Sequence, residues 1–491
     1  MKYRIFGITA AVLMIAAVIL CLYIDADEKD VSRYHQHMSA RQPDEGCDCD
    51  GSELCTHLPI LIIDTDGKDI PGEPLNDSSS DEEVFSTAED GSTTIQASLK
   101  VIDNGDSNNH PGDEAAIESM MSIRVRGNSS RYFDKKGYLI GLTDDSGEKN
   151  REEPLLGMDE FDKWALHGPY LDKSLIRNYM WYNIAGEMMD YAPNCRFCEV
   201  ILNGEYQGLY LLVETIDSSA DARLKLSEPE DNSEQVSFVL RADRGSSNPI
   251  KNVNTFSQNS YRTLMAIDIV YPGTGDLTEE RINYIEDSFS DFEKSLYSYD
   301  YDNGSYKWQE WADFDEMVDY FLINEFTSNY DAGYLSTYFY RDVRGKYKMC
   351  IWDFNSACGN YRDDYIDPHH FEMQYVPWFV MLTKDEDFIE GVIARYRELR
   401  KTYFSDEYIC DYVDKTVEYL GSAVDRNFEV WGYTWDDDMV RPAGRNPENY
   451  EEAVQQIKDF CKERGEWMDD NIDNLKQYSH ESKVKKYNHD R

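Results

Sequence analysis

The chain has 491 residues, 41% of them hydrophobic, with 36 Tyr and 9 Trp. This apolar content suffices for one large domain or two to three ordinary ones, and it excludes a globally disordered chain. The formal net charge of −46, from 49 basic and 95 acidic residues, argues against nucleic acid and anionic lipid as partners, because like charges repel.

The chain starts with an uncharged apolar run over residues 5–23, which is long enough to cross a bilayer as a helix. Lys2 and Arg4 precede this run, so the bulk of the chain should face outward. We therefore predict a signal anchor over residues 1–23 and a single-pass protein of the cell membrane with an extracytoplasmic domain. The alternative is a signal peptide, whose cleavage would release a secreted protein.

Composition divides the rest of the chain into three regions. Residues 24–56 are polar and acidic, which is typical of a stalk. Residues 57–476 carry the apolar patterns of a folded domain, and residues 477–491 form a polar tail.

The cysteines are unevenly placed. Outside the apolar run they form one polar cluster, one C-x-x-C pair and a scattered set: Cys47, Cys49 and Cys55; Cys195 and Cys198; and Cys350, Cys358, Cys410 and Cys461. An outward location permits disulfides, whereas a zinc site would need a second matched pair of ligands. We favour structural disulfides or buried thiols over metal binding.

The folded part is rich in strands at its start and in helices at its end. Alternating apolar residues predict strands, and the Asn203-Gly204 turn predicts a hairpin: 58–64, 93–103, 120–127, 135–142, 194–216, 237–244 and 261–272. Helical spacing predicts one early helix and a later series: 172–189, 278–298, 309–329, 384–403, 405–420 and 449–476. This order predicts an α+β fold.

The most informative stretch is residues 320–361, which carries two aspartates in different settings. Asp331 follows an apolar helical run, and Asp353 ends a short apolar strand. Two β-rich runs joined by a turn at residues 342–345 separate them. In phosphoryl transfer one carboxylate orients a hydroxyl nucleophile and another holds the metal on the phosphates. The alternative is a buried hairpin with two solvated loop aspartates.

Four segments, taken together, resemble the CotH family of atypical protein kinases, first associated with the bacterial spore coat. They are IRVRGNSSRYFDKKGYLIGL (123–142), WALHGPYLDKSLIRNYMWYNIAGEM (164–188), NCRFCEVILNGEYQGLYLLVETI (194–216) and NYDAGY…YFYRD…IWDFN (329–355). The resemblance covers about residues 57–476. It implies a bilobal, kinase-like fold with a β-rich N-lobe over about 57–217 and a helical C-lobe over about 218–476.

The resemblance also implies a function. The implied function is an ATP-dependent protein kinase with Mg²⁺ or Mn²⁺ as cofactor. It would phosphorylate Ser or Thr of secreted, surface or spore-coat proteins. The alternative is a non-catalytic pseudokinase of the same fold that serves as a surface scaffold, coat component or adhesin. A calcium-dependent carbohydrate binder or hydrolase, which needs two carboxylates facing a groove, is also left open by so acidic a chain.

Residues that bind the nucleotide follow from the same resemblance. A small polar turn, Gly127, Asn128, Ser129 and Ser130, would approach the phosphates. Lys135 or Lys136 would pair with the phosphates. Glu214, at the crossover between lobes, would contact the nucleotide or cap the crossover. Adjacent strand residues point to opposite faces, and the family pattern favours Lys135.

The helix predicted over 172–189 would correspond to the kinase αC helix. Glu187 would pair with the lysine or be an exposed helix residue. Arg177 and Asn178 match the family core, and a structural salt bridge is the favoured interpretation.

Catalysis and metal binding are assigned to the acidic loops. Asp331 would position the acceptor hydroxyl, and Asp353 would bind Mg²⁺ through carboxylate oxygen. The chain departs from the family twice, because Asn355 replaces a second acid and Ser336 stands where kinases place a metal-binding Asn. Both remain candidate metal ligands, but they weaken a second metal site and leave a pseudokinase open.

Overall fold

The computed structural model describes residues 33–38, 47–76, 84–105, 107–218, 223–257, 265–298 and 307–479. The chain divides into two units, Met1–Tyr34 and His35–Arg491, and the elements named here belong to the second. The predicted anchor over residues 1–23 lies outside the described residues. Among the helices that are described, none combines the length and the apolar character needed to span a bilayer. The membrane anchor therefore stays a prediction.

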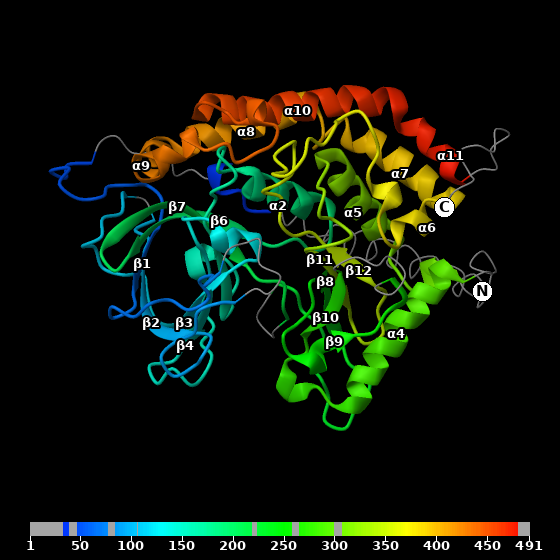
Figure 1. Cartoon of the computed structure of the whole chain (residues 1–491), viewed down its shortest axis with the longest axis horizontal. Coiled ribbons are helices and arrows are strands. Elements are labelled where there is room, and N and C mark those ends of the chain that lie inside the picture. Colours follow the sequence, from blue (N-terminus) through cyan, green and yellow to red (C-terminus); the bar gives the residue numbers. More distant parts are fainter. Residues whose placement is uncertain are drawn as a thin grey trace, which may run out of the picture. The chain divides into compact units, whose positions relative to one another are not determined.

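Seven strands close into a barrel in the order β1-β2-β3-β4-β5-β7-β6 (Figure 1). Neighbours are antiparallel, except that β1 and β6 pair in parallel and close the barrel. The strands are β1 (Ile60–Asp64), β2 (Ile95–Ile102), β3 (Ile117–Arg126), β4 (Gly137–Thr143), β5 (Lys163–His167), β6 (Cys195–Leu202) and β7 (Glu205–Glu214).

Local sequence explains the barrel well. Buried and partly exposed residues alternate along β3, so that Met121, Ile123 and Val125 fill the interior while Arg124 and Arg126 face outward. The β6–β7 hairpin turns at Asn203 (φ 52°) and Gly204 (φ 82°), and two successive positive φ angles are what a tight hairpin turn requires.

A second sheet has the order β12-β11-β8-β10-β9. Its strands are β8 (Phe238–Asp243), β9 (Asn252–Val253), β10 (Ala266–Tyr271), β11 (Thr337–Arg341) and β12 (Lys348–Cys350). All of them lie in the region predicted to be a helical lobe. The mixed α+β class is confirmed, but the division into a β-rich N-lobe and a helical C-lobe is not, because β-branched and aromatic runs after residue 236 assemble a sheet of their own.

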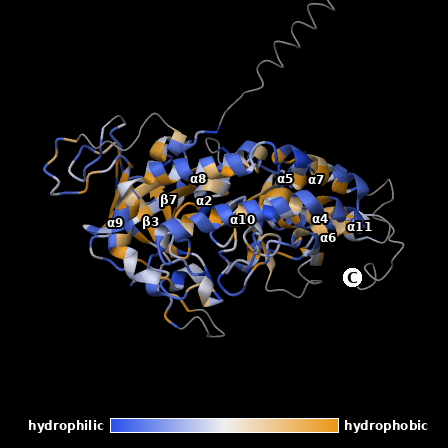
Figure 2. Ribbon diagram, turned by 90° about the horizontal axis from the view of Figure 1, so that it is seen from above, coloured by the Kyte–Doolittle hydropathy of each residue, from blue (hydrophilic) through white to orange (hydrophobic). Residues whose placement is uncertain are grey.

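The helices cover both sheets. They are α2 (Arg177–Met188), α4 (Glu279–Tyr297), α5 (Phe314–Thr327), α6 (Phe379–Leu382), α7 (Glu386–Leu399), α8 (Asp406–Leu420), α9 (Ser422–Trp431), α10 (Tyr450–Asn471) and α11 (Lys476–Ser479). Side-chain oxygens cap the starts of the longest ones: Thr278, Asp313, Ser405 and Asn449. In Figure 2 the outer faces of α8 and α10 are hydrophilic and the strands behind them are hydrophobic.

Helix α2 differs from the predicted helix and matters for the site. It begins only at Arg177, because the Asp172 carboxylate accepts hydrogen bonds from the backbone N–H groups of Ser174 and Arg177 and holds the chain in a turn. The helix is buried over most of its length and belongs to the large core that also contains α5 and the second sheet. Helix α2 can therefore position the loops that pack against it.

The described cysteines are all free thiols, so the predicted disulfides are absent among them. The second alternative, buried thiols, is correct for Cys195, Cys198, Cys350, Cys358 and Cys461.

Candidate functional site: two acidic loops beside an arginine cluster

Asp331 lies in the loop that ends helix α5. The helix stops at Ser328, which adopts a left-handed conformation (φ 47°) and donates its N–H to the carbonyls of Asn324 and Glu325. The carbonyl of Asp331 then accepts the N–H groups of Tyr334 and Leu335, at 3.1 and 2.8 Å. This turn fixes the backbone and leaves the Asp331 carboxylate half-buried.

Asp353 lies just after strand β12 and is held by helix α2. Its φ of 64° is uncommon for a residue with a side chain, and such strain clusters at functional sites. The Asp353 N–H donates to the Tyr182 hydroxyl at 3.0 Å, and the Phe354 N–H donates to Asn178 Oδ1 at 2.6 Å. The N–H of Asn355 hydrogen-bonds to the Asp353 carboxylate.

The two carboxylates share one electrostatic environment. Burial and then the charge of Asp353 raise the pKa of Asp331 to about 6, while Arg244 opposes that rise. Burial also raises the pKa of Asp353, and Arg126 opposes it. The nearby charge of Asp243 adds to the rise in both pKa values. Two half-buried carboxylates of this kind favour a proton or a cation between them.

The cations come from the barrel and from the second sheet. Arg124 and Arg126 extend from the outer face of β3, and the Arg126 guanidinium lies 5.3 Å from the centre of the Trp352 ring. Burial and the charges of Arg131, Arg126 and Arg241 lower the pKa of Arg124 to about 10. Within the described ranges, the guanidinium groups of Arg124 and Arg126 form no hydrogen bond or ion pair. A cluster of like charges with free donors favours an anion.

Asn329 adds an uncommitted oxygen to the same place. Its amide nitrogen donates to Asn324 Oδ1 at 3.1 Å and to the Asp353 carbonyl at 3.3 Å. Its Oδ1 is buried, and no hydrogen-bond partner for it lies among the described residues. A buried polar atom without a partner is costly, so this oxygen suits a ligand that the site would bind.

Residues 123–468 match the family model described as CotH kinase protein. The chain belongs to the CotH family. It is also 25% identical over 245 residues to "Inner spore coat protein H" of Bacillus subtilis (strain 168), a match over 49% of this chain and 59% of that protein. The chain thus spans less than two thirds of that relative. The region shared with the family contains both acidic loops and the two β3 arginines.

Lys135, the lysine favoured from the CotH pattern, lies away from the acidic loops. Its ammonium is buried and donates to the Leu209 carbonyl and to Asn427 Oδ1, both at 2.6 Å. Lys136 pairs with Glu73 at 2.8 Å. Strand β4 begins only at Gly137, so the two lysines precede the strand in which they were expected. The cations that oppose the rise in the pKa values of the two carboxylates are Arg244 and Arg126 instead.

The polar turn predicted to approach phosphate follows β3 directly. Gly127 has a φ of 108°, and a Cβ there would lie 1.9 Å from Ser130 Oγ, so only glycine fits. The turn continues into a short 3-10 helix, Ser129–Tyr132, and Asn128 precedes it. Since the turn adjoins Arg126, it lies beside the arginine cluster.

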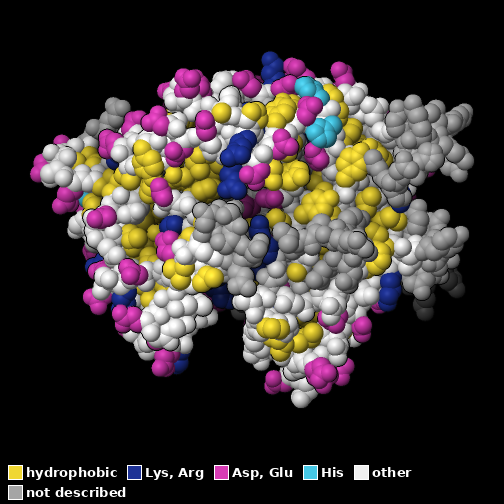
Figure 3. All heavy atoms as spheres, viewed as in Figure 1, with side chains coloured by type: hydrophobic (Ala, Val, Ile, Leu, Met, Phe, Trp, Pro, Cys, Tyr) yellow, Lys and Arg dark blue, Asp and Glu magenta, His cyan; other side chains and the backbone are white. Residues whose placement is uncertain are grey.

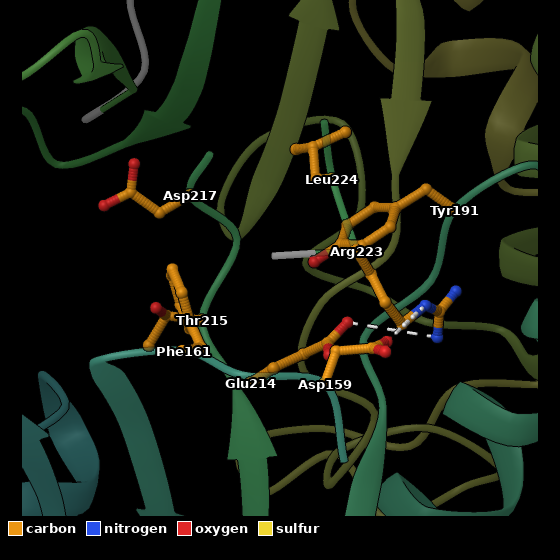
Figure 4. A pocket seen from close by; sticks show the side chains of 8 residues that line it. All are labelled: Asp159, Phe161, Tyr191, Glu214, Thr215, Asp217, Arg223 and Leu224. Atoms are coloured by element: carbon orange, nitrogen blue, oxygen red, sulfur yellow. Dashed lines mark ion pairs between the residues drawn. The ribbon is translucent and has the colours of Figure 1, made fainter. Parts of the chain in front are cut away.

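Glu214 lies at the end of β7, where the chain leaves the barrel. Its carboxylate and that of Asp159 each lie 4.0 Å from the Arg223 guanidinium, which stacks over Tyr191 (Figure 4). The pocket between these side chains encloses about 10 Å³, which holds roughly one water and no nucleotide base. This placement favours the alternative role, a cap of the crossover.

The remaining helix α2 residues are structural. Arg177 pairs with Asp172 at 2.5 Å and donates to the Ala357 carbonyl, as the salt-bridge interpretation required. Glu187 binds His35 at 2.7 Å and does not pair with Lys135.

The two departures from the family pattern have different placements. Asn355 orients Asp353 through its N–H, and its carbonyl accepts the Asn360 side chain at 2.7 Å. Ser336 lies in the loop before β11 with a φ of 51°. Among the described residues, neither side chain forms a hydrogen bond with the carboxylate pair, so their roles as metal ligands stay predictions.

Five residues of this site were not predicted from the sequence: Arg124, Arg126, Asn329, Asp243 and Arg244. Arg126 and Asn329 each stand inside a quoted family segment, directly before Gly127 and just before Asp331. The signal was therefore available for these two. Asp243 ends β8 and Arg244 follows it, and only the pairing of β8 with β11 brings them close.

Proposed function

We propose that this chain is an ATP- and divalent-metal-dependent protein kinase that transfers a phosphoryl group to Ser or Thr of spore-coat, surface or secreted proteins. The observation that supports it best is that Asp331 and Asp353, from separate loops, lie close enough for the charge of Asp353 to raise the pKa of Asp331 after burial, with Arg126 acting on Asp353. Family membership and the similarity to a spore-coat protein support the same conclusion.

The acidic loops fit a hard divalent cation. Asp331, Asp353 and Asn329 offer carboxylate and amide oxygens, which Mg²⁺ and Mn²⁺ prefer. Burial and then the charge of Asp353 raise the pKa of Asp331, and a bound cation would relieve both effects. When bound, the metal neutralises charge on the transferring phosphoryl group. The protein's own part is to hold Asp353 in its strained conformation, through Tyr182 and Asn355.

The outer face of the barrel fits the nucleotide. A hollow of about 170 Å³ lies there, and its walls include Arg124, Leu139, Gly141 and Lys163. We assign the base to this hollow and the phosphates to Arg124 and Arg126, which lie on the same strand face and lead toward Asp353. Figure 3 shows acidic side chains scattered over one face, with several Lys and Arg side chains near its middle.

Asp331 fits the role of the carboxylate that accepts the proton of the substrate hydroxyl. A group with a pKa of about 6 is largely ionised at neutral pH and is a stronger base than an ordinary aspartate. It would orient the hydroxyl oxygen toward the phosphoryl group and hold its proton.

Asn355 and Ser336 favour a second candidate, a non-catalytic coat or surface scaffold of the same family. Without a second acid after Asp353, fewer charges hold a second metal. Such a protein would retain the fold and lose turnover.

Transfer of labelled γ-phosphate to a generic Ser/Thr acceptor protein, with the full chain and Mg²⁺ or Mn²⁺, tests the proposal. We expect Asp331→Ala and Asp353→Ala each to lower transfer by at least about 100-fold. Asp470→Ala, at an exposed position of α10, should leave it unchanged. Absence of transfer, including autophosphorylation, together with absence of ATP binding would favour the scaffold.

A further inference from the structure

Four metal-ligating side chains meet at a place that the proposed kinase site does not use. They are Cys47, Cys49, Cys55 and His110, and their donor atoms all lie within 4.8 Å of one another. Cys47 Sγ is 3.5 Å from His110 Nε2. The family match begins only at residue 123, so this cluster lies outside it.

The backbone brings the four residues together. The segment before β1 runs beside the loop between β2 and β3, and two hydrogen bonds join them: the Asn109 N–H to the Thr56 carbonyl at 2.7 Å and the Thr56 N–H to the Asn109 carbonyl at 3.2 Å. Cys55 and His110 are the immediate neighbours of this bridge in sequence. A turn at Gly51 (φ 68°) returns the chain, so that Cys47 and Cys49 also face His110.

The distances fit a tetrahedral metal. With Zn–S of about 2.3 Å and Zn–N of about 2.0 Å, tetrahedral geometry sets S···N at about 3.5 Å and S···S at about 3.8 Å. The observed Cys47–His110 distance equals the first value, and the 4.8 Å limit includes the second. A disulfide, by contrast, needs two sulfurs at about 2.05 Å and leaves a histidine without a role.

A second layer of polar groups orients the donors. The Asp113 carboxylate lies 3.3 Å from His110 Nδ1, which leaves Nε2 directed at the cysteines. The Asn104 amide in turn donates to Asp113 at 2.7 Å, and the Asn108 amide donates to Cys55 Sγ at 3.1 Å. A carboxylate on the far nitrogen of a histidine is the usual arrangement behind a metal ligand.

We propose that Cys47, Cys49, Cys55 and His110 bind one Zn²⁺ in a closed, structural site. Binding replaces the protons of the three thiols, which pass to solvent, and no oxidant or reductant is needed. Four protein ligands leave no open position for catalysis. The site fastens the segment that enters β1 to the β2–β3 loop of the barrel.

For Cys47, Cys49 and Cys55, a metal site replaces the disulfides or buried thiols that the sequence favoured. The fourth ligand could not be predicted from the spacing of the cysteines, because His110 lies in a different loop, far along the chain. Only the pairing of Thr56 with Asn109 brings it into place.

Elemental analysis of the purified full chain tests the proposal, with one zinc per chain as the expected result. Cys55→Ser and His110→Ala should each lose the zinc, while Cys410→Ser, at a partly exposed cysteine of α8, should keep it. Zinc that is retained in both ligand variants would overturn the proposal, as would a disulfide among the three cysteines of the unmodified chain.

Cobalt replacement keeps the test decisive if a variant fails to fold. The unmodified chain, stripped by a chelator and loaded with Co²⁺, should show the intense visible absorption of a tetrahedral cobalt–thiolate complex. Adding Zn²⁺ should remove that absorption and restore the thermal unfolding temperature that chelation lowers. A weak, octahedral cobalt spectrum would contradict the site.

Discussion

Replacing Tyr182 by Phe removes a single hydroxyl from α2 and leaves the Asp353 N–H without its acceptor. The bond is 3.0 Å long, and Tyr182 is 2% exposed. A buried donor left unsatisfied costs about 1–3 kcal/mol. Asp353 has a positive φ, so the loss should let its backbone relax away from the binding conformation. If the whole cost appears in binding, the Kd for metal–ATP rises by about 5- to 150-fold.

Calorimetric titration of the full chain with Mn²⁺–ATP measures this change, and thermal unfolding measures stability in parallel. Tyr179→Phe is the matched control, because Tyr179 lies on the same helix, is equally buried, and hydrogen-bonds to His37 instead. We expect Tyr179→Phe to lower stability and to leave the Kd unchanged. Equal affinities for Tyr182→Phe and the unmodified chain would refute the positioning role of Tyr182.

Other predictions concern pH, a buried lysine and a buried ion pair. Protons compete with metal for Asp331, so Mn²⁺ affinity should fall by up to about tenfold per pH unit as pH drops below about 6. In a titration series over pH, Asp331→Asn should make the Mn²⁺ affinity depend less on pH. Lys135→Met should leave ATP affinity unchanged but lower the unfolding free energy by about 1–3 kcal/mol, since buried acceptors lose their donor; a large loss of ATP binding would restore the lysine to the site. Arg464→Ala leaves the fully buried Glu325 without its cationic partner and should cost about 3–5 kcal/mol in urea unfolding. Arg397→Ala, in an exposed pair, should cost less than about 1 kcal/mol, and equal losses would contradict this account.

Most helices and strands could be predicted from the sequence, because the periodicity and turn residues that specify them lie within each element. The alternation in β3, the Asn203-Gly204 turn and the capped helices α4, α8 and α10 all form where the sequence indicated. Strand β5 and helix α9 were missed, and both are short, with 5 and 10 residues. Sheet membership was also missed, because strand pairing such as β8 with β11 depends on contacts far apart in sequence.

Some candidate site residues could also be predicted from local sequence, whereas others depend on the fold. Asp331 and Asp353 could be selected from their loop settings, and after burial the charge of Asp353 is the next cause of the raised pKa of Asp331. Lys135 could not be judged, because its burial against Asn427 depends on helix α9 packing on β7. The sequence could name residue types and their loops, but the partner of each buried charge comes from the fold.

The most direct test of the central claim is Mn²⁺ binding by the full chain in the presence of ATP, followed by electron paramagnetic resonance of the free ion. The account predicts ATP-dependent binding that is lost in both Asp331→Ala and Asp353→Ala and retained in Asp470→Ala. Unchanged Mn²⁺ binding after either loop substitution would contradict a shared metal site at these two carboxylates.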